Sequence, residues 1–140
     1  MPDIGGTVRT IMLADGTVSG LVGTRVYSDV LTQNATTPAI TYKVVDTVTN
    51  DVLAGIADVS RARIQVDCYG VTRPAANTLA DAVRLALHGH EHTATGGQYV
   101  LDITLPSGEV YLVNEPEDGT DKRRFINSQD FMVSYRTTTS

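Results

Sequence analysis

The chain has 140 residues, of which 41% are hydrophobic and 19% charged. This composition is typical of a folded globular protein and excludes disorder for most of the chain. The formal net charge of −5 is opposite to that of a general nucleic-acid binder. The one cysteine, Cys68, excludes an intrachain disulfide framework and an all-cysteine zinc site. No apolar run reaches the about 20 residues that cross a bilayer, and no secretory signal pattern is present, so we expect no membrane contact.

The N-terminal half is predicted to hold one helix and three strands. Apolar spacing indicates a short helix over 7–13, ended by the turn at 15–16. A short strand is predicted over 25–27 and a longer one over 39–46, where apolar and polar residues alternate. The clearest strand covers 59–71, because Ala62, Ile64, Val66 and Cys68 form an apolar face and the residues between them, with Arg61, a charged or polar one.

The most regular helix follows this strand. Thr72 can cap its N-terminus, Pro74 lies in the first turn and Gly89 is expected to end it. Its apolar residues form one stripe at helical spacing: Ala76, Leu79, Ala80, Val83 and Leu87.

The C-terminal part is predicted to be extended. A loop over 88–97 leads to an alternating strand over 99–105. A turn at 106–108 then connects this strand to a second one over 110–113, as a β-hairpin. A long strand over 125–135 closes the fold.

The order of these elements predicts an α+β fold, in which a mainly antiparallel β-sheet has about two helices packed on one face. No repeat or linker divides the chain. We therefore expect a single domain over 1–136, followed by a short flexible tail over 137–140.

Three histidines at alternate positions, His88, His90 and His92, form the most suggestive chemical pattern. In a strand this spacing would place three rings on one side, as a metal site needs. Gly89 and the glycine-containing segment that follows favour a helix end and a polar loop, so we expect no functional metal. Cys68 lies on the apolar face of its strand, where a buried cysteine is commoner than a nucleophile. Without a phosphate-binding loop or catalytic template, we expect neither catalysis nor a cofactor.

Charged residues gather in two places. Arg61 and Arg63 share the polar face of the strand over 59–71, and a basic run at 122–124 adjoins an acidic loop. Solvated surface is the ordinary interpretation of both groups. Charge complementarity between neighbouring subunits is the functional alternative, and a head-to-tail ring could use it.

The segments that carry a family resemblance span nearly the whole chain. They are 14–27, the strand at 61–69, the helix at 77–84, the acidic segment 115–119, the pair Arg123-Arg124 and the ending 130–135. In this order and spacing they resemble the tail-completion, or tail-terminator, proteins of long-tailed bacteriophages.

The resemblance implies a small α/β subunit that forms a six-fold ring on the head-proximal end of the tail tube. The ring would stop tube polymerisation and join the tail to the head. The implied partners are further copies of the chain, the tail tube protein and the head connector or stopper protein. Genomic DNA would pass through without sequence-specific binding, which suits an acidic chain. The implied location is the head–tail junction of the virion, after assembly in the host cytoplasm, without catalysis or cofactor.

Two surfaces are expected to serve this assembly. The first, near the ring lumen or a subunit contact, comprises Glu115, Glu117, Asp118, Asp121, Arg123 and Arg124. The second is the strand face with Arg61 and Arg63, together with an exposed Tyr42 or Tyr69.

Two alternatives stay open at this point. The first is a head-completion or connector-adaptor protein of the same virion neck, although such adaptors are commonly more helical. The second is a small cytoplasmic metal- or ligand-binding enzyme that uses the loop with His88, His90 and His92.

Overall fold

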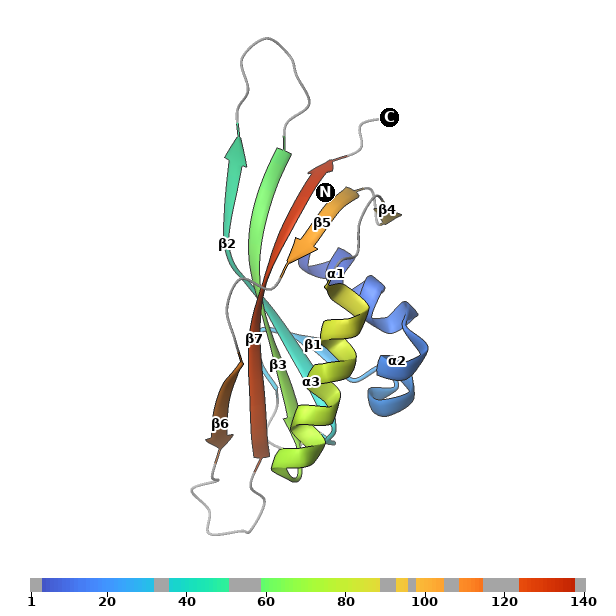
Figure 1. Cartoon of the computed structure of the whole chain (residues 1–140), viewed down its shortest axis with the longest axis vertical. Helices are drawn as coiled ribbons and strands as arrows, with labels where there is room; N and C mark the ends of the chain where they lie inside the picture. The colour runs from blue at the N-terminus through green and yellow to red at the C-terminus, as the bar shows by residue number, and fades with distance from the viewer. Residues whose placement is uncertain are drawn as a thin grey trace.

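The computed structural model shows a twisted β-sheet with helices on one of its faces (Figure 1). It describes residues 4–31, 36–50, 59–88, 93–95, 98–104, 109–114 and 124–137. Within these ranges the helices are α1 (Ile4–Ala14), α2 (Gly16–Val22) and α3 (Arg73–Leu87). The strands are β1 (Val26–Ser28), β2 (Ala39–Asn50), β3 (Val59–Gly70), β4 (Thr93–Thr95), β5 (Gln98–Thr104), β6 (Val110–Asn114) and β7 (Arg124–Thr137). The predicted α+β class, with a mainly antiparallel sheet and helices on one face, is confirmed.

β7 is the strand around which the sheet is built. The strand order is β1-β2-β3-β7-β5-β4, and β6 also pairs with β7. β3 lies antiparallel along one edge of β7, from Ser60↔Tyr135 to Gly70↔Phe125. The other edge is shared, because β5 pairs with residues 132–137 and β6 with residues 124–128. β1 and β2 form the parallel pair among the described strands.

β5 and β6 are not partners, so the prediction of a β-hairpin at 106–108 is wrong. Both strands run antiparallel to β7 and lie one after the other along the same edge. The alternation of residues identified both strands. It could not show that β7, with 14 residues, offers enough edge to pair with each of them separately.

Some predicted bounds also need correction. β2 extends to Asn50 instead of ending at residue 46, and β4 lies inside the predicted loop over 88–97. β7 continues through Thr137, which pairs with Gln98, so the predicted tail begins one residue too early. Residues 138–140 of that tail lie outside the described part of the chain.

Asp15 separates two helices and does not simply end one. Its Oδ1 accepts hydrogen bonds from the backbone N–H groups of Thr17 (3.0 Å) and Val18 (3.1 Å), so that it caps the N-terminus of α2. Val18 and Val22, one helical turn apart, are fully buried. The sequence analysis missed α2 because its glycines indicated turns. The aspartate cap, followed by apolar residues at helical spacing, is the signal that identifies it.

α3 agrees with its prediction. Thr72 Oγ1 accepts a hydrogen bond from Ala75 N at 3.1 Å and caps the helix, and the predicted apolar stripe is buried. The helix ends where His88 N donates to Arg84 O at 2.8 Å. Gly89, which was expected to end it, lies outside the described residues.

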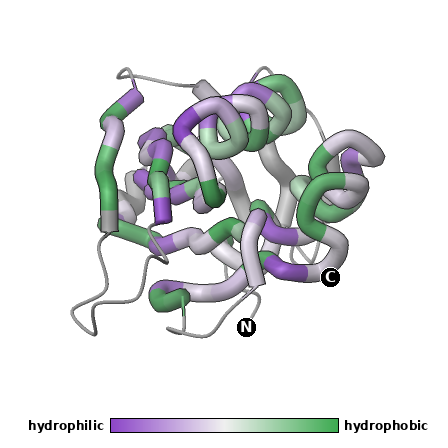
Figure 2. The backbone as a smooth tube through the Cα atoms, turned by 90° about the horizontal axis from the view of Figure 1, so that it is seen from below, coloured by the Kyte–Doolittle hydropathy of each residue, from purple (hydrophilic) through white to green (hydrophobic). Residues whose placement is uncertain are grey.

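The hydrophobic core lies between the helices and the sheet. Seen from below, the helices gather on one side of the strands (Figure 2). Side chains from both layers meet there with at most 1% of their surface exposed, among them Met12, Ile64, Leu79 and Phe131. Phe131 and Val133 share the buried face of β7, as their spacing predicted.

Two buried amides link α3 to β7. Asn127 Nδ2 donates to Asn77 Oδ1 at 2.9 Å, and Gln129 Nε2 donates to the Ala80 carbonyl at 3.0 Å. Both β7 side chains are at most 1% exposed. Their side-chain oxygens, Asn127 Oδ1 and Gln129 Oε1, have no hydrogen-bond partner among the described residues. Losing either donated bond would leave a further buried polar group unsatisfied, at a cost of about 1–3 kcal/mol, so the two bonds favour this placement of α3 on the strand.

Gly70, at the end of β3, is predicted to tolerate no side chain. A Cβ there would lie 2.7 Å from Ala76 N and 3.0 Å from Ala75 Cβ. We expect Gly70→Ala to lower the free energy of unfolding by about 2 kcal/mol in urea denaturation. Gly20→Ala is the control, because nothing lies within 4 Å of its Cβ and alanine should stabilise the helix by up to about 1 kcal/mol. A Gly70→Ala variant as stable as wild type would contradict this packing.

Cys68 is predicted to be inert in the folded protein. Its side chain is fully buried, and this burial, with a smaller effect of Asp67, raises the pKa of the thiol far above its ordinary value. Because the thiolate is the reactive form, a chromogenic thiol reagent at mildly alkaline pH should label it only after unfolding in urea. Equal labelling rates in native and denatured protein would show that the thiol is accessible.

Candidate assembly surfaces

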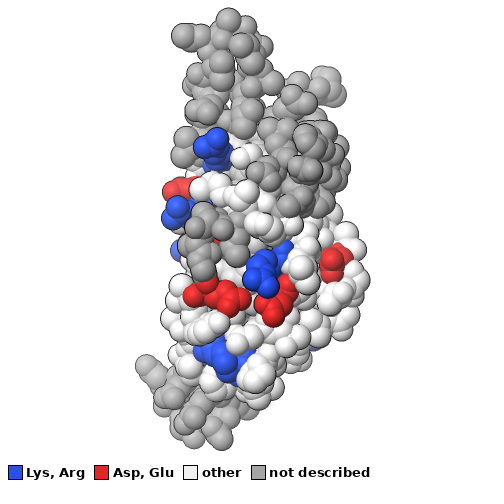
Figure 3. Space-filling view, viewed as in Figure 1, with Lys and Arg blue, Asp and Glu red and all other residues white. Residues whose placement is uncertain are grey.

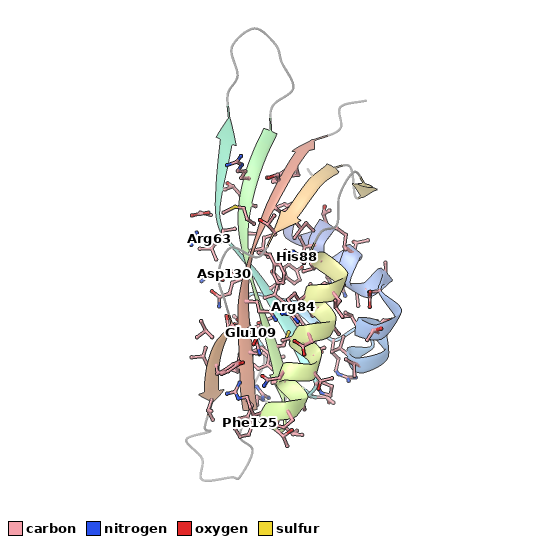
Figure 4. The ribbon with its side chains drawn as sticks, viewed as in Figure 1. Arg63, Arg84, His88, Glu109, Phe125 and Asp130 are labelled. Atoms are coloured by element: carbon pink, nitrogen blue, oxygen red, sulfur yellow. The ribbon has the colours of Figure 1, made fainter. Side chains whose placement is uncertain are left out.

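The sheet face opposite the helices carries Arg61 and Arg63. Both arginines are exposed. Ala62, which lies between them, and Ile64, which follows Arg63, are buried on the helix side of the sheet. Figure 4 shows Arg63 and Asp130 on the side of the sheet away from α3. In the described part of the chain the one ion pair joins Asp81 and Arg84 of α3, at 3.3 Å. The two β3 guanidinium groups therefore form no ion pair with any described residue.

In the view of Figure 3, which includes α3 as well as the edge of the sheet, basic and acidic side chains of the described residues are interspersed. The register places Asp46 of β2 beside Arg63 and places Asp130 of β7 beside Gln65. A surface of mixed sign favours charge pairing with another protein over adhesion to a uniformly charged polymer.

The expectation that Tyr42 is exposed is wrong. Only 8% of its surface is accessible, and it belongs to the hydrophobic core. Tyr42 lies two residues after Ile40 in the strand, so both side chains lie on the helix-facing side of β2. The phenol ring is large enough to pack there. Tyr69, on the opposite face, is half-buried, and Thr41 Oγ1 donates to its hydroxyl at 3.4 Å. Burial raises the pKa of Tyr69, although the hydrogen bond with Thr41 opposes this rise.

Most of the acidic loop lies outside the described residues. This applies to Glu115, Glu117, Asp118, Asp121 and Arg123. Arg124 is the first residue of β7 and pairs with Asn114 of β6. The register places Arg63 beside Met132, so about 26 Å of β7 separates it from Arg124. Arg124, the described residue of the first predicted surface, therefore lies far from the second.

His88 is the described member of the histidine pattern. It caps the C-terminus of α3 and is exposed. Figure 4 shows it on the helix side of the sheet, near the end of α3. His90 and His92 lie outside the described residues. Among the residues that the structure does describe, no group of three His, Cys, Asp or Glu side chains could hold a metal ion.

The sequence analysis missed the surface formed by β6. Four consecutive apolar residues of this strand are 45–56% exposed: Val110, Tyr111, Leu112 and Val113. Val110 and Leu112 lie on the face away from α3, since they pair with Ser128 and Ile126. The unbroken apolar run was a signal, because a strand with one buried face would alternate.

Arg73, at the start of α3, holds β6 against β7. It donates to the Ile126 carbonyl through Nη1 and to the Leu112 carbonyl through Nη2, both at 2.7 Å. Its guanidinium carbon lies 5.0 Å from the ring centroid of Tyr111 and 5.4 Å from that of Phe125. These contacts fix a strand that has little hydrophobic burial of its own.

With this geometry established, the sequence was compared with known proteins. Residues 6–121 match the family model described as tail completion protein gp17. The chain belongs to this family. It is therefore a structural protein of a phage tail, with its place in the virion tail. A search of curated proteins found no match.

The fold of this tail-completion protein also occurs in a solved particle. A chain from the virion of a native gene transfer agent (GTA) particle superimposes with a TM-score of 0.63. The alignment covers 95% of this chain and 94% of the other, at 16% sequence identity. At this identity the likeness shows a shared fold.

None of the described helices is long and apolar enough to cross a membrane.

Removing the Arg73 side chain is expected to loosen β6. Arg73→Ala should lower the free energy of unfolding by about 2 kcal/mol, because two charge-assisted hydrogen bonds are lost. Hydrogen exchange of the β6 amides should become faster than in wild type. Arg84→Ala, which removes another arginine of α3 in an exposed ion pair, should cost less than about 1 kcal/mol. Unchanged exchange of β6 in Arg73→Ala would contradict this anchoring role.

Proposed function

We propose that six copies of this chain form a ring at the head-proximal end of the tail tube. The ring ends tube polymerisation and joins the tail to the head connector or stopper protein. The match to the tail-completion family over residues 6–121 carries the proposal. The full-length likeness to a chain from a gene transfer agent virion supports it. In this role the chain works by assembly and performs no catalysis.

The charge of the chain supports passage of DNA through such a ring. Each copy has a formal net charge of −5, and a ring multiplies this charge around its opening. DNA phosphates are repelled by such a surface, so that the genome crosses without sticking. In the proposed ring the acidic residues Glu115, Glu117, Asp118 and Asp121 lie near the lumen or a subunit contact.

The β3 arginines are proposed to contact a neighbouring subunit. Arg61 and Arg63 are exposed and form no ion pair with described residues of their own chain. Carboxylates of a neighbour would supply the missing partners and fix the orientation of the two subunits. Arg123 and Arg124, beside the acidic loop, are also proposed to contact a neighbouring subunit.

Charge reversal at β3 tests this contact. Arg61→Glu/Arg63→Glu should leave the folded monomer intact, because both side chains are exposed, and should abolish the ring. Light scattering measures the mass of the assembly, and circular dichroism during heating checks the fold. Arg84→Glu, an exposed arginine on α3, is the control and should assemble like wild type. Normal rings of the double variant would remove β3 from the interface.

The function itself is tested in assembling phage. Particles made without this protein should contain tail tubes of irregular excess length that carry no heads, as seen by electron microscopy. Supplying the protein from a plasmid should restore uniform, head-joined tails. Tubes of normal length that merely lack heads would contradict termination and indicate a head-completion adaptor instead.

A further inference from the structure

β6 is an edge strand among the described strands, and it carries no charged residue of its own. One edge pairs with β7, and no described strand pairs with the other. Natural edge strands usually carry charged residues or proline that prevent pairing with another chain. Val110–Asn114 contains neither. Instead, its four apolar side chains are 45–56% exposed on both faces of the strand.

This exposure belongs to an ordered strand and not to a frayed end. Arg73 binds the Leu112 carbonyl and stacks on Tyr111, and five residue pairs hold β6 to β7. Figure 1 shows β6 at the rim of the sheet, on the opposite side of β7 from α3 in this view, and Figure 2 shows mostly hydrophobic residues along it. A preformed apolar edge of this kind fits a protein strand, which can bond to the backbone and cover both faces.

The same sheet offers a second open edge, on β2. β1 pairs only with Ile40–Tyr42, so β2 has no described neighbour on that side beyond Tyr42. A β-bulge between Val44 and Asp46 interrupts the first part of this open edge. From residue 47 to 50 the strand is regular, and its sequence, Thr-Val-Thr-Asn, carries no charge.

By contrast, the outer edge of β1 already forms hydrogen bonds within the chain. The Val26 carbonyl accepts a hydrogen bond from Arg9 Nε at 3.1 Å. Val26 N donates to the Thr24 carbonyl and Val30 N to the Ser28 carbonyl, both at 2.8 Å. Three of its outward groups are thus already bonded within the chain, which leaves β2 as the better acceptor for another strand.

We propose that β6 of one copy of this chain pairs with residues 47–50 of β2 in the next copy. The contact continues the sheet from subunit to subunit. It joins two different edges of the same fold, so it is head-to-tail, as a closed ring requires. This inference rests on the proposed ring function, and it names the strands that form the contact.

Lysines on β6 test the proposal. Val110→Lys/Leu112→Lys places two charges on the exposed face away from Arg73, and we expect at least about a tenfold loss of the assembled fraction in light scattering. Val71→Lys/Leu85→Lys is the matched control, because these residues are also apolar and 66% and 79% exposed. It should assemble like wild type. Rings of the β6 variant at the wild-type level would overturn the inference and leave the ring proposal intact.

Cross-linking identifies the partner strand without relying on the lysine variant. In Val113→Cys/Thr47→Cys both cysteines lie on the helix-facing side of the continued sheet, because Val113 pairs with Phe125 and Thr47 with Ala62. A short bismaleimide should therefore link successive copies into a ladder that ends at six. Either single variant should give no ladder, and Cys68 is too buried to react. Dimers from Val113→Cys alone would show β6 paired with β6 and overturn the inference. No cross-linking of a demonstrated ring would also overturn it, whereas a ladder from open chains would support the contact and contradict ring closure.

Discussion

The fold depends on one constraint, the pairing of β7 along both of its edges. β3 follows one edge for almost the full length of the strand, while β5 and β6 divide the other between them. Phe131 is buried on one face of the strand, and on the same face the amides of Asn127 and Gln129 bond to α3. Because a strand held in this way cannot shift register without breaking several contacts at once, it positions every other element.

The assembly surfaces follow from this arrangement. The helices bury one face of the sheet, so the opposite face is left to polar and charged side chains such as Arg61 and Arg63. β7 is longer than either β5 or β6, so both strands fit along the same edge. β6 pairs with the N-terminal part of β7, and four of its side chains remain 45–56% exposed. Arg73 compensates by bonding the strand to the start of α3. The chain thus presents an ordered edge and a charged face outside its core.

Local patterns predicted the elements whose signals agree with one another. The strand over 59–71 alternates strictly from Arg61 to Cys68, and α3 has a cap, an early proline and an apolar stripe. α2 was missed because its glycines outweighed the Asp15 cap. The predicted hairpin at 106–108 was wrong because strands that are neighbours in sequence were assumed to pair with each other. Only the three-dimensional structure shows that both strands pair with β7. The burial of Tyr42 could be predicted, because it lies two residues from Ile40 and shares its face of the strand. The unbroken apolar run of β6 indicated a strand without a single buried face, but it could not show that both faces are exposed.

The most direct test of the account is to mix the purified protein with tail tubes that lack it and to image the tube ends by negative stain. Light scattering of the protein alone provides the mass of any free assembly. The account predicts a six-fold ring with a central hole on one end of each tube, and a free ring, where it forms, of about 90 kDa from 15.0 kDa subunits. Tubes that stay bare, or a stable dimer that does not bind them, would contradict it.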